Sequence, residues 1–367
     1  KARTRLPEEL LHELLKNSAT QLEPDLPPKW LWKGRTVNIV DGSTLLMADT
    51  PDNQAQYPQH GNQEPGVGFP IARVVVVISL ATGGILDIAM GQYKGKKTGE
   101  HALLRRLLHL FKSGDIALGD SYYDSFFLVA TLRAMGVDTV FQLHGARQSD
   151  FRRGERLGKD DHIVVWKKPQ RPEWMSEEQY ALIPNEMKMR EARIAIDIAG
   201  FRARTITLTT SFLDPTQTSR TELGDLYKQR WCGELDLRSI KQTMQMDFLK
   251  GKTPEMVRKE IYAHLLAYNL IRKIMVAAAR KCGRSPRQLS FKGCLQTLNA
   301  YRPLWKNTTL ASERKALYEK LLEAVSQHIV GNRPNRTEPR VRKRRPKPFP
   351  LMKKARHLYR KPVPRAA

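Results

Sequence analysis

The sequence has few cysteines and no long apolar segment, and each scarcity excludes a class of protein. Three cysteines among 367 residues give an odd number, at spacings that match neither a disulfide framework nor a zinc motif. We therefore expect free thiols and a reducing, intracellular compartment. The longest uncharged apolar run, Val74 to Leu86, is too short to cross a membrane. The chain begins at Lys1 rather than at a methionine, so we expect a missing N-terminal stretch.

Acidic residues are also scarce relative to basic ones. There are 63 Lys and Arg against 37 Asp and Glu, which gives a net charge of +26. Such a surplus indicates a polyanionic partner. Nucleic acid is favoured over a membrane surface because no long basic amphipathic helix with an aromatic face stands out. Residues 331–367 hold 14 Lys or Arg and one acid, Glu338, so this tail contributes +13, half of the total.

The apolar pattern predicts a mixed α/β fold. The predicted order after a helical lead-in is three strands, a helix, a strand, a helix and a strand. The first three strands can form an antiparallel meander, and the last two can form a parallel unit through the intervening helix. That topology is the ribonuclease-H-like fold, a mixed sheet flanked by helices. The predicted regions are a helical lead-in (1–34), the first part of a catalytic domain (35–144), a β-rich insertion (145–218), the rest of the catalytic domain (219–281), a helical region (282–330) and a basic, proline-rich tail (331–367).

One predicted helix carries an unusual set of polar side chains. Over Glu222–Gln245 we expect a single helix on which Tyr227, Arg230, Glu234 and Lys241 fall within an arc of roughly 60°, at about 100° per residue. The stripe is compatible with ordinary charge pairs on a surface helix. It is equally compatible with a site that combines a hydroxyl, a guanidinium, a carboxylate and an ammonium group.

Two aspartates favour the functional site over the ordinary surface helix. We expect Asp41 to end the apolar strand Val37–Val40 and Asp120 to end the strand Ile116–Gly119. Each alone is typical of a turn or a helix cap, but with Glu234 they make three carboxylates on a fold whose first and fourth strands are neighbours. Mg²⁺ or Mn²⁺ would relieve their repulsion, and such oxygen-ligand sites suit two-metal phosphoryl transfer.

Other polar residues are given ordinary roles. We expect Asp124 to begin a helix and Asp87 to be an edge or solvent-facing acid.

The spacing Tyr-x2-Arg-x3-Glu-x6-Lys, from Tyr227 to Lys241, resembles the signature of cut-and-paste bacterial insertion-sequence transposases of the DDE class. The likeness extends over about residues 35–350 and includes Val40–Thr44, Gly95–His101, Leu118–Tyr123 and the basic end around Arg342–Pro350. The segment before the first aspartate is shorter than these enzymes usually have.

The resemblance implies a DNA transposase that cleaves transposon ends and transfers strands. Asp41, Asp120 and Glu234 would be catalytic and would hold two divalent ions, Mg²⁺ or Mn²⁺. The residues expected to contact DNA are Tyr227, Arg230 and Lys241 at phosphates, Trp231 at a displaced base or simply packed beside the motif, and Arg342, Lys343, Arg344 and Arg345 in the tail.

The implied partners are double-stranded DNA, both the terminal inverted repeats and the target, and a second copy of the chain once it is assembled on DNA. No membrane partner is expected, and the implied location is the bacterial cytoplasm, in association with the nucleoid. Two other functions stay open. One is a ribonuclease-H-like nuclease without strand transfer. The other is a domesticated, non-catalytic DNA-binding protein, against which the three intact acids argue.

Overall fold

A mixed sheet runs through the protein, whose computed structural model describes residues 5–95, 97–195, 205–331 and 351–359. Within these ranges the sheet has ten strands in the order β3-β2-β1-β4-β5-β9-β8-β7-β6, and β10 pairs with β1. The strands are β1 Val37–Met47, β2 Ile71–Ser79, β3 Ile85–Gln92, β4 Ile116–Gly119, β5 Asp138–Gln142, β6 Glu155–Gly158, β7 Asp161–Lys167, β8 Glu186–Ala195, β9 Thr205–Thr210 and β10 Phe248–Leu249.

The central five strands have the predicted connections. β1, β2 and β3 form an antiparallel meander, and the turn between β2 and β3 contains Gly83 with φ of 76°, a value that favours glycine. β4 lies parallel to β1, and β5 lies parallel to β4. This arrangement confirms the mixed, ribonuclease-H-like sheet.

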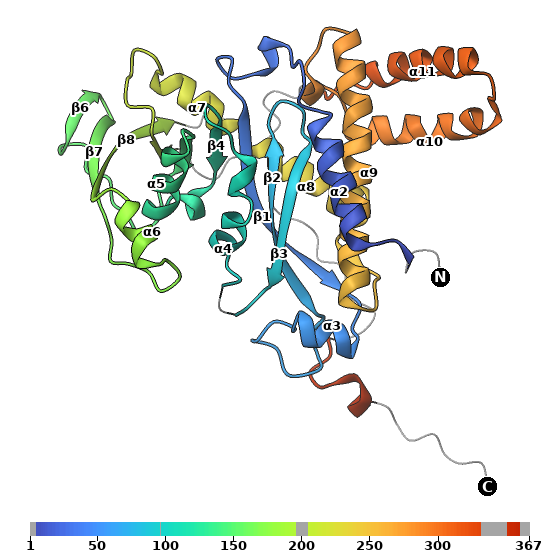
Figure 1. Ribbon diagram of the computed structural model, residues 1–367, viewed down its shortest axis with the longest axis horizontal. Coiled ribbons are helices and arrows are strands. Elements are labelled where there is room, and N and C mark those ends of the chain that lie inside the picture. The colour runs from blue at the N-terminus through green and yellow to red at the C-terminus, as the bar shows by residue number, and fades with distance from the viewer. Residues whose placement is uncertain (1–4, 96, 196–204, 332–350, 360–367) are drawn as a thin grey trace.

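Both faces of the central sheet are buried under helices. Alternate residues of β1 enter separate apolar clusters, with Ile39 in one and Val40 in the other, as the period of two of a strand requires. Helices α2, α8 and α9 cover the first face, and α4 and α5 cover the second (Figure 1). Their bounds are α2 Glu8–Thr20, α4 Glu100–Arg105, α5 Phe126–Ala134, α8 Trp231–Arg238 and α9 Pro254–Lys281.

The β-rich segment extends the same sheet. β9 pairs antiparallel with β5, and β8, β7 and β6 follow outward from it. A short helix, α6 Glu177–Leu182, lies between β7 and β8 in the chain. This end of the sheet lies opposite the end covered by α9 (Figure 1).

The prediction of a single long helix over Glu222–Gln245 is wrong. The segment forms α7 Arg220–Lys228, then α8, then a π-helical turn at Ser239–Thr243. Packing on the sheet overrides local helical periodicity here. α8 lies so close to β1 that a Cβ on Gly233 would come within 2.9 Å of Ile39 Cγ2.

Two helices near the C-terminal end project from the body of the protein. α10 Phe291–Asn307 and α11 Ala311–Ser326 pack on each other and on α9 as a helical hairpin (Figure 1). A further short helix, α3 Pro51–Gln56, follows β1. Among the helices that the structure describes, we find none with the length and apolar character needed to span a bilayer.

Candidate active site

The two aspartates lie just beyond the paired part of two neighbouring parallel strands. β1 and β4 are in register at Ile39 and Leu118, and each of these residues is followed two positions later by an aspartate, Asp41 or Asp120. α8 packs against β1 and carries Glu234. All three acids line one open cavity of about 600 Å³.

The expectation that Asp41 ends its strand is wrong. β1 continues to Met47, and its pairing with β2 is unbroken from Asn38 opposite Ser79 to Leu46 opposite Ile71. The polar residues after Val40 stay in the strand because β2 satisfies their backbone groups. Asp41 therefore lies within β1, held by sheet hydrogen bonds on the β2 side, whereas Asp120 directly follows β4 as predicted.

Each acid accepts a hydrogen bond from a nearby group. Asp41 Oδ1 accepts from Gly42 N at 2.8 Å, and Asp120 Oδ1 accepts from Tyr122 N at 2.8 Å. Glu234 Oε1 accepts from Arg230 Nη2 at 2.6 Å. The three carboxylates thus occupy defined positions around the cavity.

Burial and mutual repulsion perturb the first acid. Burial raises the pKa of Asp41 from its ordinary value of 3.8 to about 6, and the neighbouring charges of Asp120 and Glu234 add to the rise. Arg230 and the backbone N–H of Gly42 act in the opposite direction. Because burial is the main cause, the ionised Asp41 carboxylate lacks the solvation that it would have in water, and a bound cation would compensate for that loss.

The donor set suits a hard divalent cation. Three carboxylates offer oxygen ligands alone, the preference of Mg²⁺ and Mn²⁺. In the described ranges no three His, Cys, Asp or Glu side chains stand close enough to form a complete ligand set as they are. One oxygen of Glu234 is paired with Arg230 at 2.6 Å. The residues present fit the ion in chemistry.

Basic side chains line the same cavity. Arg230, Arg238 and Lys241 are among its walls. Arg230 precedes the first turn of α8, and Lys241 lies in the π-helical turn. Lys241 Nζ donates to Ser43 Oγ at 3.1 Å and to Thr44 O at 3.0 Å. Positive groups from α8 and from the turns at both of its ends therefore flank the acids.

Tyr227 lies beside Arg230, whose guanidinium carbon is 5.9 Å from the tyrosine ring. Its side chain is buried, it is not among the residues that line the cavity, and its hydroxyl donates to Gln142 Oε1 at 3.1 Å. Trp231 is 39% exposed at the start of α8, with the Arg238 guanidinium 6.0 Å from its ring. The tail residues Arg342, Lys343, Arg344 and Arg345 lie outside the described residues.

Asp124 does not begin a helix. Its carboxylate is buried and accepts from Thr209 Oγ1 at 2.7 Å, from His144 N at 2.8 Å and from Arg147 Nη1 at 2.9 Å. The residue that caps α5 is Ser125. Asp124 therefore ties the loop after Asp120 to the start of the β-rich segment, through partners too distant in sequence to leave a local signal.

Asp87 is not solvent-facing. Its side chain is 3% exposed and pairs with His12 Nε2 at 2.7 Å. Asp87 does lie on an edge strand, because β3 is the end of the sheet, but the solvent-facing half of the expectation is wrong because α2 packs against β3. This pair belongs to the packing of α2 and takes no part in the cavity.

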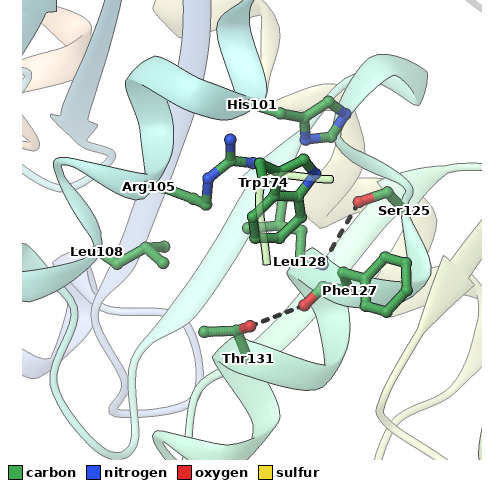
Figure 2. Close-up of a pocket in the computed structure, with 8 residues that line it drawn as sticks. All are labelled: His101, Arg105, Leu108, Ser125, Phe127, Leu128, Thr131 and Trp174. Atoms are coloured by element: carbon green, nitrogen blue, oxygen red, sulfur yellow. Dashed lines mark hydrogen bonds between the residues drawn. The ribbon is translucent and has the colours of Figure 1, made fainter. Parts of the chain in front are cut away.

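A second, smaller cavity lies between α4 and α5. It has a volume of about 190 Å³ and mostly apolar walls. Figure 2 shows Trp174, from the β-rich segment, beside Arg105 of α4, whose guanidinium lies 3.7 Å from the indole ring. Ser125 and Thr131 form local hydrogen bonds within α5. The cavity therefore lies where the β-rich segment meets the core.

Comparison with known proteins gives a consistent set of relatives. Residues 32–270 match the model of the transposase DDE domain family. The transposase InsG for insertion sequence element IS4 of Escherichia coli (strain K12) is 29% identical over 362 residues, which cover 96% of this chain and 77% of that protein. A cryo-EM structure of piggyBac transposase in a synaptic complex with hairpin DNA aligns with a TM-score of 0.43 and 11% identity, over 82% of this chain and 63% of that chain. This chain thus spans less than two thirds of the piggyBac chain.

Proposed function

We propose a chemical mechanism for a chain that belongs to the transposase DDE domain family and that catalyses DNA transposition. In this mechanism, one site cleaves the strands at the transposon ends and joins the freed 3′ ends to target DNA. The observation that carries the mechanism is the convergence of Asp41, Asp120 and Glu234, from β1, the end of β4 and α8, on a cavity that Arg230 and Lys241 also line.

The three carboxylates are the proposed ligands of two divalent ions, Mg²⁺ or Mn²⁺. When bound, such ions activate the attacking water or 3′ hydroxyl and stabilise the leaving oxygen. Asp41 lies within β1, Asp120 directly follows β4, and Glu234 lies on α8, which packs against β1. The ligands thus lie on or next to regular elements, which suits precise positioning.

The cations of the cavity are the proposed phosphate contacts. Arg230 presents a fork of N–H donors, a geometry that matches phosphate oxygens. Lys241 is tied to β1 through Ser43 and Thr44, which places its charge beside the acids. Together these groups would hold the scissile phosphate within reach of the carboxylates, as in-line displacement requires. Under this proposal, Tyr227 helps to position Arg230, because the guanidinium carbon lies 5.9 Å from the tyrosine ring.

The proposed partners follow from charge and family. A net charge of +26 suits the phosphate backbone of double-stranded DNA, here the terminal inverted repeats of the element and its target. Pairing of two ends calls for a homodimer assembled on DNA. The proposed location is the cytoplasm, in association with the nucleoid.

The test is incubation of the protein with Mg²⁺ and a DNA fragment that carries the terminal repeats flanking its gene. We expect cleaved ends and joined product, and loss of both in Asp120→Asn. The matched control is Asp225→Asn, an exposed acid paired with Lys228, which should keep full activity. Cleavage without joining would indicate a nuclease, and binding without cleavage would indicate a non-catalytic DNA-binding protein.

A further inference from the structure

The sheet alone does not fix the gap between the two aspartates. The parallel pairing of β1 with β4 ends at Ile39 opposite Leu118, two residues before each acid. Beyond that point β1 continues beside β2, whereas the chain leaves β4 for a 3-10 helix at Ser121–Tyr123. β4 itself stays paired with β5 as far as Gly119 opposite Phe141, so the position of Asp120 relative to Asp41 depends on contacts other than the β1–β4 pairing.

Glu100, the first residue of α4, lies against the segment that carries Asp41. A Cβ built on Gly42 would come within 2.5 Å of Glu100 Cδ and Oε2. The Glu100 carboxylate thus occupies the space beside the strand backbone at position 42, where a side chain would displace it. Glu100 is partly buried, and burial raises its pKa. A carboxylate in such a place needs a hydrogen-bond partner.

Tyr123 supplies that partner from the segment that carries Asp120. Its hydroxyl donates to Glu100 Oε2 at 3.1 Å, and its side chain is fully buried. The Tyr123 ring also packs on the residue before Asp120, since a Cβ on Gly119 would come within 3.0 Å of Tyr123 Cδ2. The hydrogen bond from Tyr123 to Glu100, together with the close approach of Glu100 to Gly42, therefore links the two acid-bearing segments just beyond the end of their pairing.

We propose that Glu100 and Tyr123 form a strut that sets the spacing of Asp41 and Asp120, and that Glu100 is a positioning residue for the metal-binding acids. The strut depends on the proposed function, because it acts through the carboxylates assigned to metal there. Groups that orient metal ligands change metal affinity by about 10–100-fold when removed. The strut's effect is thus measurable as metal binding, apart from DNA cleavage.

The test is Mn²⁺ binding to the full chain, followed by electron paramagnetic resonance of the free ion. We expect Glu100→Ala and Tyr123→Phe each to raise the Mn²⁺ dissociation constant about tenfold, and the double variant to raise it no further, because both remove the same hydrogen bond. Glu100→Gln keeps an oxygen that accepts from Tyr123 and should stay close to the wild-type value. Tyr180→Phe, which loses a hydroxyl contact to Pro169 O in the β-rich segment, is the matched control and should bind normally.

The alternatives give different results. If Glu100→Gln binds as weakly as Glu100→Ala, the residue acts through its charge and the strut is wrong. Wild-type binding by Tyr123→Phe overturns it equally, and melting temperatures on the same samples show whether each variant is folded. The Asp120→Asn variant tests the proposed metal site separately from the strut. If that variant keeps tight Mn²⁺ binding, the metal site proposed for the three acids fails, and the strut fails with it.

Discussion

The charge on Asp41 can be tested without DNA and without metal. The pKa of this carboxyl rises from 3.8 to about 6 on folding, chiefly through burial. A carboxyl whose folded pKa is raised contributes stability that is full below the unfolded pKa and is lost as pH rises through the folded pKa. At pH 8 the ionised group therefore destabilises the metal-free fold. A shift of about two units corresponds to about 3 kcal/mol, and partial solvent access reduces this to about 1–2 kcal/mol.

Asp41→Asn removes the charge and keeps the oxygen that accepts from Gly42 N. In urea unfolding with a chelator at pH 8, we expect the variant to be more stable than the wild type by about 1–2 kcal/mol. The difference should vanish near pH 4, where the wild-type carboxyl is protonated in the fold. Asp225→Asn, whose side chain is 62% exposed, should change stability by less than about 0.5 kcal/mol at either pH. A variant less stable than the wild type at pH 8 would refute the reasoning.

Three further predictions concern Arg230, the buried acid Asp124 and the basic tail. Arg230→Ala should slow single-turnover cleavage about 10–100-fold, since a charge-assisted contact is worth about 1.5–3 kcal/mol, and Arg230→Lys should recover part of the rate. A lower melting temperature with full activity would contradict that role. Asp124→Ala should destabilise the fold by about 3 kcal/mol in urea unfolding because it strands Arg147 and a buried hydroxyl, and an unchanged midpoint would count against the network. Deletion of residues 331–367 should reduce the salt dependence of DNA binding, and an equal slope would show that the tail makes no phosphate contacts.

The core sheet was predictable because its signal is local. Apolar runs bounded by turns gave the strand order, and the short connections left few ways to pair them. The length of β1 was not predictable in the same way. Gly42, Ser43 and Thr44 look like a turn in sequence, yet they remain in the strand because β2 pairs with them. That pairing partner lies about thirty residues away along the chain, so no local pattern carries it.

The prediction of one helix around Glu234 was wrong for a related reason. Its polar residues satisfy a helical period from Tyr227 to Lys241, and a straight helix is the simplest structure with that period. In the fold, Ser219 begins α7 with a capping box, and the chain then breaks before α8, which packs on β1 through Gly233. Tertiary contact decides where the break falls, and of the four residues of the stripe, Arg230, Glu234 and Lys241 line the cavity whereas Tyr227 does not.

For the site, too, features with a local sequence signal were predictable and features that depend on distant segments were not. An acid after a buried apolar run is visible in sequence, which is why Asp41 and Asp120 could be proposed, whereas the partners of those acids come from distant segments. Arg230 lies between these cases. Its spacing from Glu234 predicts a helical ion pair, and the structure has that pair at 2.6 Å. The guanidinium has five N–H donors, and the bridge to Glu234 runs through Nη2. An ion pair and a phosphate contact therefore do not exclude each other, and activity measured beside melting temperature separates their contributions.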